Sequence, residues 1–145
     1  MRNNKGFTLV ELLAVITVLG IIMIIVIPAV SNNSNTAKET VLKTKVNLIV
    51  DQATIWSEDN LNYFLTTDNR GPLQECTDTD NEVTCKITFK DLAEAGYVKY
   101  DDEDNELITD PTKKRDNLND EIIVVTYVKS TRKVSSVLDP NSTLN

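Results

Sequence analysis

An apolar stretch near the start of the chain constrains its fold more than any other feature. From Phe7 to Val30 the chain runs for 24 residues with a single charged side chain, Glu11. A helix of that length reaches about 36 Å, enough to cross a hydrocarbon core of about 30 Å. The preceding residues carry Arg2 and Lys5, and a short basic flank stays in the cytoplasm. The sequence therefore predicts a single-pass helix in the cytoplasmic (inner) membrane, with the N-terminus in the cytoplasm and the remainder outside.

Two details distinguish this stretch from an ordinary anchor. A secretory signal peptide places its small residues and cleavage site after the apolar core, whereas here the small residue, Gly6, precedes the core. The second detail is Glu11, because an acid at mid-membrane costs about 2.5–3.5 kcal/mol and so suggests a partner. Near the headgroups the cost is small, and the first turn of a helix favours a negative charge. These residues alone leave both interpretations of Glu11 open.

The residues around Gly6 form a motif. The segment 5–12, KGFTLVEL, resembles the processing site of type IV prepilins and pseudopilins. Gly20 and Pro28 lie where that family often carries a helix-loosening glycine and a kinking proline. The close match is confined to the leader and the apolar stretch, and the rest of the chain is similar to the family only in layout.

The resemblance implies a processing and assembly chemistry. A membrane peptidase would remove residues 1–6 by cutting after Gly6, and the new amino group of Phe7 would be methylated. Glu11 would then pair with the Phe7 amine of a neighbouring subunit. In the apolar centre of a fibre an unpaired charge is penalised, so a subunit out of register is disfavoured.

The same resemblance implies a function and its partners. The chain would be a structural subunit, a pilin or pseudopilin, of a type IV pilus-like fibre that is extracellular or periplasmic. Its partners would be sister subunits, the prepilin peptidase, a platform protein and an assembly ATPase. The sequence does not distinguish DNA uptake, type II protein secretion and adhesion or motility, nor a major from a minor subunit. The alternative function is that of a monomeric membrane-anchored binding domain or enzyme.

Composition narrows the function of residues 31–145, the predicted extracytoplasmic domain. The formal net charge of the chain is −7, which argues against broad contact with nucleic acid phosphates. There is no histidine, so the usual Ser/His and Cys/His nucleophile arrangements are excluded. Gly is scarce, with four in all, and no phosphate-binding loop is present. We therefore predict no catalytic residues, no cofactor and no direct nucleic acid binding.

The two cysteines, Cys76 and Cys85, predict one disulfide, because thiols outside the membrane tend to pair. The bond would close a small loop and contribute about 2.5–3 kcal/mol in the chain-entropy model. The alternative is a metal site, but two thiols without histidine leave zinc short of ligands.

Downstream of the apolar stretch the sequence predicts more helix. Local rules allow a break between Pro28 and Thr36, where a polar, weakly helix-forming run ends in a capping-box spacing. The family resemblance favours a single helix with a bend, and we expect continuity. From about residue 36 to 60 the pattern is amphipathic and predicts a core face against a sheet. That face comprises Leu42, Val46, Ile49, Ala53 and Trp56, widened by Leu48 and Ile55.

The remaining segments predict a small antiparallel sheet within about residues 83–138. Alternating apolar residues predict strands at 83–89, 121–128 and 133–138, with a further short candidate at 97–100. Apolar residues on both faces of 121–128 indicate a central strand covered on each side, and the tail from Asp139 is expected to be loose. The predicted fold class is α+β: a long N-terminal helix packed on three or four strands.

An acidic run, DDEDNE at 101–106, is the remaining candidate site. A calcium site needs several converging oxygens, which Asp101, Asp102 and Asp104 could supply. The spacing and glycine of an EF-hand are missing, and acidic runs are usually solvated loops. We therefore predict a solvated loop, with calcium binding as the alternative.

Overall fold

The computed structural model describes residues 8–142 and 144; for residues 24–33 it describes the backbone only. The predicted cleavage residues Gly6 and Phe7 lie outside this description. The chain divides into two compact units, Met1–Lys38 and Glu39–Asn145, which are described separately below.

The longest element is α1, a helix over Leu9–Asp59. The helix continues through the segment from Pro28 to Thr36, where local rules allowed a break. The capping-box spacing at 36–39 therefore lies inside a helix and does not start one. At the other end of α1, the Asp59 carboxylate accepts a hydrogen bond of 2.8 Å from the Tyr97 hydroxyl.

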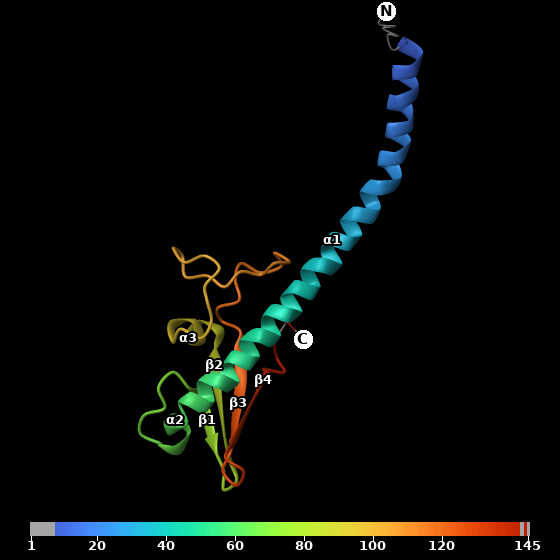
Figure 1. Cartoon of the computed structure of the whole chain (residues 1–145). Coiled ribbons are helices and arrows are strands. Elements are labelled where there is room, and N and C mark those ends of the chain that lie inside the picture. Colours follow the sequence, from blue (N-terminus) through green and yellow to red (C-terminus); the bar gives the residue numbers. More distant parts are fainter. Residues whose placement is uncertain (1–7, 143, 145) are drawn as a thin grey trace, which may run out of the picture. The chain divides into compact units, whose positions relative to one another are not determined.

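The folded unit contains a four-stranded antiparallel sheet in the order β1-β2-β3-β4 (Figure 1). The strands are β1 (Gln74–Asp78), β2 (Glu82–Thr88), β3 (Ile122–Val128) and β4 (Lys133–Leu138). Two short helices, α2 (Asn62–Leu65) and α3 (Phe89–Glu94), complete the elements. The predicted α+β class and the three best-marked strands are confirmed. The first strand was not predicted, because its residues are polar and mostly exposed.

The core lies between one face of the sheet and one face of α1, whose second half crosses the sheet in Figure 1. Helical spacing of three and four places the apolar stripe of α1 on a single side, and the period of two in β2 and β3 does the same for the strands. The fully or nearly buried residues of this contact include Val46, Ile49, Ala53 and Trp56 from α1, and Val83, Cys85, Ile87, Ile123, Val125 and Tyr127 from the sheet.

The buried face of α1 is narrower than predicted. Leu48 and Ile55, which were expected to widen it, are exposed. Each precedes a buried residue by one position, and one residue turns a helix by about 100°. This rotation points the side chains of Leu48 and Ile55 away from the sheet and into solvent.

Two further strand predictions need correction. Residues 97–100 form no strand, because the Tyr97 N–H bonds to the Leu92 carbonyl and closes the turn after α3. Gly96 permits this turn through its φ of +83°. The second correction concerns β3, which was expected to be covered on each side. Its residues alternate between buried and half-buried, so only the face toward α1 is sealed.

The tail after β4 is tied down, contrary to the expected looseness. The Asp139 N–H donates to the Ile122 carbonyl at 2.9 Å, and the Asp139 residue is buried. The Ser142 hydroxyl donates to Glu121 at 2.6 Å, and Leu144 packs against the core. Short polar turns after Asp139 thus fold the described part of the tail back onto the unit.

Neighbouring residues on α1 give a direct test of this packing. Ile49→Ala should lower the free energy of unfolding by about 2–4 kcal/mol, because it removes buried methyl groups and leaves a cavity. Leu48→Ala should change it by no more than about 0.5 kcal/mol, because Leu48 is 59% exposed against 4% for Ile49. Urea unfolding of the detergent-solubilised chain measures both. Equal losses in the two variants would contradict the described face of α1.

Candidate functional site

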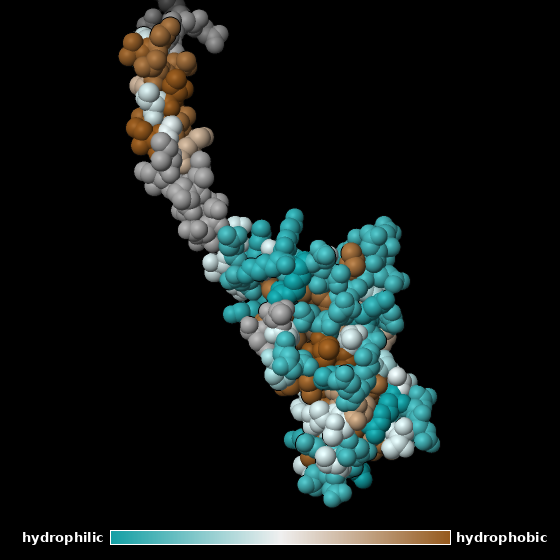
Figure 2. All heavy atoms as spheres, turned by 180° about the vertical axis from the view of Figure 1, so that it is seen from behind, coloured by the Kyte–Doolittle hydropathy of each residue, from teal (hydrophilic) through white to brown (hydrophobic). Residues whose placement is uncertain are grey.

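The described start of α1 carries a concentration of exposed apolar side chains. Figure 2 shows hydrophobic residues over this segment and a largely hydrophilic surface on the visible face of the folded unit. Contiguous apolar surface on this scale is rare on a soluble monomer and marks a contact with a membrane or another protein. The exposed residues are Leu9, Val10, Leu12, Leu13, Val15, Ile16, Val18, Leu19, Ile21, Ile22 and Met23.

Within the part of the chain that the structure describes, no helix is both long enough and apolar enough to cross a membrane.

The first turn of α1 is closed by a reciprocal pair of side chains. The Thr8 backbone N–H and its hydroxyl both donate to Glu11 Oε2 at 3.0 Å, and the Glu11 N–H donates to the Thr8 hydroxyl at 3.3 Å. This is the geometry of a capping box, in which a threonine and a glutamate three residues later satisfy each other's backbone groups. The T-x-x-E spacing of residues 8–11 was a signal for it that the sequence analysis did not use. The carboxylate is thereby fixed at the beginning of the helix.

The other predicted residues of this segment are less informative. Gly20 lies within α1, and a Cβ placed on it would meet nothing within 4 Å. Pro28 belongs to α1, but its side chain lies outside the described residues, as do Gly6 and Phe7.

The predicted pair Cys76 and Cys85 forms a disulfide between β1 and β2. The two Cα atoms are 4.1 Å apart, and Cys85 is buried in the core. The bond attaches an edge strand that contributes few buried side chains of its own.

The acidic run at 101–106 does not gather its carboxylates around one point. Asp101 pairs with Lys45 of α1 and accepts a 2.7 Å hydrogen bond from the Thr109 N–H. Asp102 instead accepts from Asn105. No group of three or more His, Cys, Asp or Glu side chains among the described residues could hold a metal ion. Asp101 therefore anchors the loop to the helix, a contact that no local pattern predicted.

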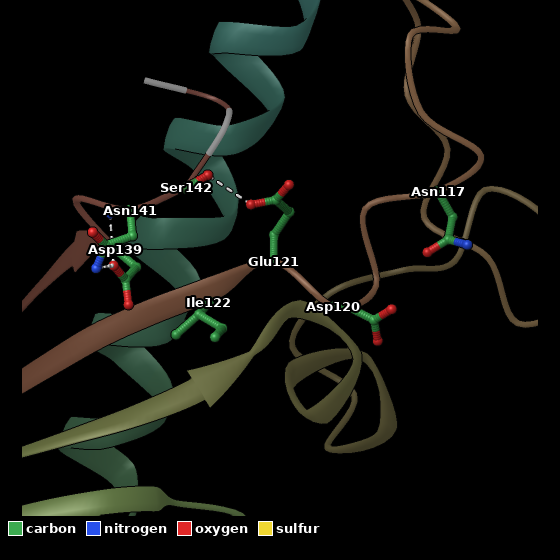
Figure 3. Close-up of a pocket in the computed structure, with 7 residues that line it drawn as sticks. All are labelled: Asn117, Asp120, Glu121, Ile122, Asp139, Asn141 and Ser142. Atoms are coloured by element: carbon green, nitrogen blue, oxygen red, sulfur yellow. Dashed lines mark hydrogen bonds between the residues drawn. The ribbon is translucent and has the colours of Figure 1, made fainter.

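A surface pocket of about 270 Å³ lies beside the C-terminal tail (Figure 3). In this view Ser142 and Glu121 point toward each other, joined by their hydrogen bond. Asp139 accepts from the Asn141 backbone N–H at 2.8 Å and lies 3.7 Å from Lys86. These bonds hold the tail against the start of β3. Its lining is Asn117, Asp120, Glu121, Ile122, Asp139, Asn141 and Ser142.

Three of the tethering carboxylates have lowered pKa values. Burial alone would raise the pKa of Asp101 and of Asp110. Lys45 and Thr109 outweigh it for Asp101, and Thr112 with Arg115 outweighs it for Asp110. For Asp139 the backbone hydrogen bond from Asn141 is the main cause of the lowered pKa, opposed by burial and assisted by Lys86.

These lowered pKa values predict acid sensitivity. A carboxylate whose pKa is lower in the folded chain contributes stability above its unfolded pKa, about 3.9 for Asp, and loses it as the pH falls through the folded value. The free energy of unfolding should therefore decrease as the pH drops below about 4. Asp110→Asn should lower the free energy of unfolding by about 1–2 kcal/mol at pH 7, because it removes a hydrogen-bonded buried charge opposite Arg115. The variant should also lose less stability than the unaltered chain as the pH drops below about 4. Asp80→Asn, in an exposed turn, is the matched control. If Asp110→Asn lost as much stability at acid pH as the unaltered chain, the role given to Asp110 would be refuted.

Comparison with known proteins bears on the N-terminal segment. Residues 1–27 match the family model described as the prokaryotic N-terminal methylation motif. The predicted resemblance of this segment to type IV prepilins and pseudopilins is thereby confirmed.

Three similar proteins come from three kinds of machine. The chain is 36% identical over 62 residues to type II secretion system core protein G of Pseudomonas aeruginosa. It is 38% identical over 63 residues to the type IV wide pilus major component PilA4 of Thermus thermophilus, and 33% identical over 58 residues to a ComG operon protein 3 homolog of Bacillus licheniformis.

These similarities are partial on both sides. They cover 43%, 43% and 40% of this chain and 44%, 48% and 60% of the respective relatives. No solved structure gave a significant match. The relatives therefore support the class of the protein, while the machine that it serves is a separate question.

Proposed function

We propose that this chain is a structural subunit of a type IV pilus-like fibre. The observation that carries the proposal is the methylation motif at residues 1–27, followed by a helix segment with exposed apolar side chains. The subunit would wait in the cytoplasmic membrane, be cut between Gly6 and Phe7, and move its apolar segment from lipid into the centre of a fibre. The fibre would lie outside the cytoplasm, in the periplasm or beyond the cell.

Glu11 is the proposed registration residue of this assembly. Its carboxylate lies in the first turn of α1, held there through Oε2 by Thr8. A charge fixed at that position among apolar side chains favours an arrangement that supplies a counter-charge. The methylated amine of Phe7 on a neighbouring subunit is the proposed partner.

A structural role fits the folded unit better than an enzymatic one. Its carboxylates tether loops and the tail, as Asp101 and Asp139 do. The remaining partners that we propose are the prepilin peptidase, a platform protein and an assembly ATPase. The relatives come from pilus, secretion and ComG systems, so the proposal stops at the fibre subunit and does not extend to one machine.

Processing gives the first test of this proposal. Intact-mass measurement of the chain purified from its host should show loss of residues 1–6 and the addition of one methyl group at Phe7. Gly6→Leu should retain the leader, because it replaces the small residue that precedes the proposed cut. Retention of residues 1–6 by the unaltered chain, in cells that process other prepilins, would instead indicate a membrane-anchored domain outside the fibre class.

Glu11 gives the second test. Glu11→Gln should leave cleavage intact and sharply reduce incorporation into fibres, because the amide preserves the capping hydrogen bonds but removes the charge. Glu11→Ala should also leave cleavage intact and sharply reduce incorporation into fibres. Thr17→Ala, in the same segment, is the control and should assemble normally. Immunoblots of sheared fibres measure incorporation, and fibres of normal content from both Glu11 variants would remove its proposed role.

A further inference from the structure

The disulfide between β1 and β2 presents its two sulfurs differently to solvent. Cys85 is completely buried, whereas Cys76 belongs to the exposed edge strand and is only partly buried. Thiol–disulfide exchange begins when a thiolate attacks one sulfur of the bond, and access helps to decide which sulfur is attacked. Cys76 is therefore the sulfur that an incoming thiolate reaches, and Cys85 is the one that leaves.

A leaving thiolate at Cys85 would place a negative charge in the core, which is costly without a partner. The Arg70 guanidinium supplies that partner, because its Nη1 donates to Cys85 Sγ at 3.6 Å. A neighbouring arginine favours the thiolate form of a cysteine, and a thiol with a lower pKa leaves faster in exchange. The sulfur that is shielded from attack is thus the one equipped to carry the charge.

Arg70 is held in this position from two sides. Its side chain is only 16% exposed, and Nη2 lies 3.3 Å from the Asp78 carboxylate. Its backbone carbonyl accepts from the Leu73 N–H at 3.1 Å, and the Leu73 side chain is buried. The guanidinium therefore lies against Cys85 Sγ with little freedom to turn away.

Asp78 does not cancel the charge of Arg70, because it also pairs with a second cation. Lys129 Nζ donates to the Asp78 carboxylate at 2.7 Å. This hydrogen bond is the main cause of the lowered pKa of Asp78, with Arg70 contributing less. One carboxylate thus faces two cations, and positive charge is left over beside the sulfur of Cys85.

We propose that Cys76 is a site of reversible thiolation by a low-molecular-weight thiol, with Cys85 as the leaving sulfur and Arg70 as its positioning residue. The incoming thiolate forms a bond to Cys76 Sγ while the Cys76–Cys85 bond breaks, and its electron pair leaves on Cys85 Sγ. In the reverse step the Cys85 thiolate attacks Cys76 Sγ and expels the small thiolate. One disulfide replaces another, so no oxidant or reductant is consumed.

The size of the thiol follows from the burial of Cys76. A partly buried sulfur admits a small thiol more readily than the active site of another protein. All the residues of the site lie in the folded unit, Glu39–Asn145, so the proposal stands apart from the fibre function.

The position of the adduct gives the first test, and it uses the unaltered full chain in detergent. Reduced glutathione is added without denaturant, and early samples are quenched in acid, alkylated, digested and analysed by peptide mass. The trapped intermediate should carry glutathione on Cys76 and the alkyl group on Cys85. Glutathione on Cys85, or on both cysteines equally, would overturn the proposal.

The rate of exchange tests the role of Arg70. Arg70→Gln should slow the loss of the disulfide to glutathione at least about threefold, because the pKa of the leaving thiol rises. A purely structural role predicts the opposite, since a loosened edge strand would expose the bond and speed its loss. Arg70→Lys should retain part of the rate because it keeps the charge. Arg132→Gln, at an exposed position, is the matched control and should exchange like the unaltered chain. An Arg70→Gln rate equal to or above that of the unaltered chain would reject the assignment.

Discussion

The fold depends on the burial of one narrow stripe of α1 against the sheet. Full burial of a large aliphatic or aromatic side chain contributes roughly 1.5–3 kcal/mol, and Val46, Ile49 and Trp56 all lie in this contact. Ala53 is completely buried between them.

The same helix has a different surface toward its N-terminus. From Leu9 to Met23 apolar residues point in every direction, whereas from residue 41 onward polar residues alternate with apolar ones around the helix. An all-round apolar helix requires cover from lipid or protein on every side, while an amphipathic one requires it on a single face. One continuous element thus combines a segment suited to an apolar environment with a segment that packs on the sheet of the folded unit.

The features that sequence reasoning predicted are those with a local pattern. The helical stripe from Val46 to Trp56 and the alternation in β3 and β4 identified their elements, and two cysteines in a domain predicted to be extracytoplasmic identified the disulfide. The N-terminal methylation motif was equally recognisable, because its residues are contiguous. Leu48 was assigned to the wrong face because periodicity locates an apolar stripe without setting its width.

The features that were missed depend on contacts between distant residues. The first strand is held by backbone pairing and by Cys76, so its polar side chains gave no strand signal. The contact between Asp101 and Lys45 joins residues 56 positions apart, and the tail is held by Glu121 and Ile122. Such contacts arise only once the chain is folded.

For the proposed fibre subunit, the bond between Cys76 and Cys85 sets an order of events. Disulfides form and persist in oxidising compartments, and this one fastens the outermost strand to its neighbour. With the thiols reduced, that edge would be held by its backbone hydrogen bonds and by exposed ion pairs such as Lys86 with Glu75. In the proposed function, translocation would therefore precede formation of this bond, and a disulfide-bonded edge strand would identify a chain that has already left the cytosol.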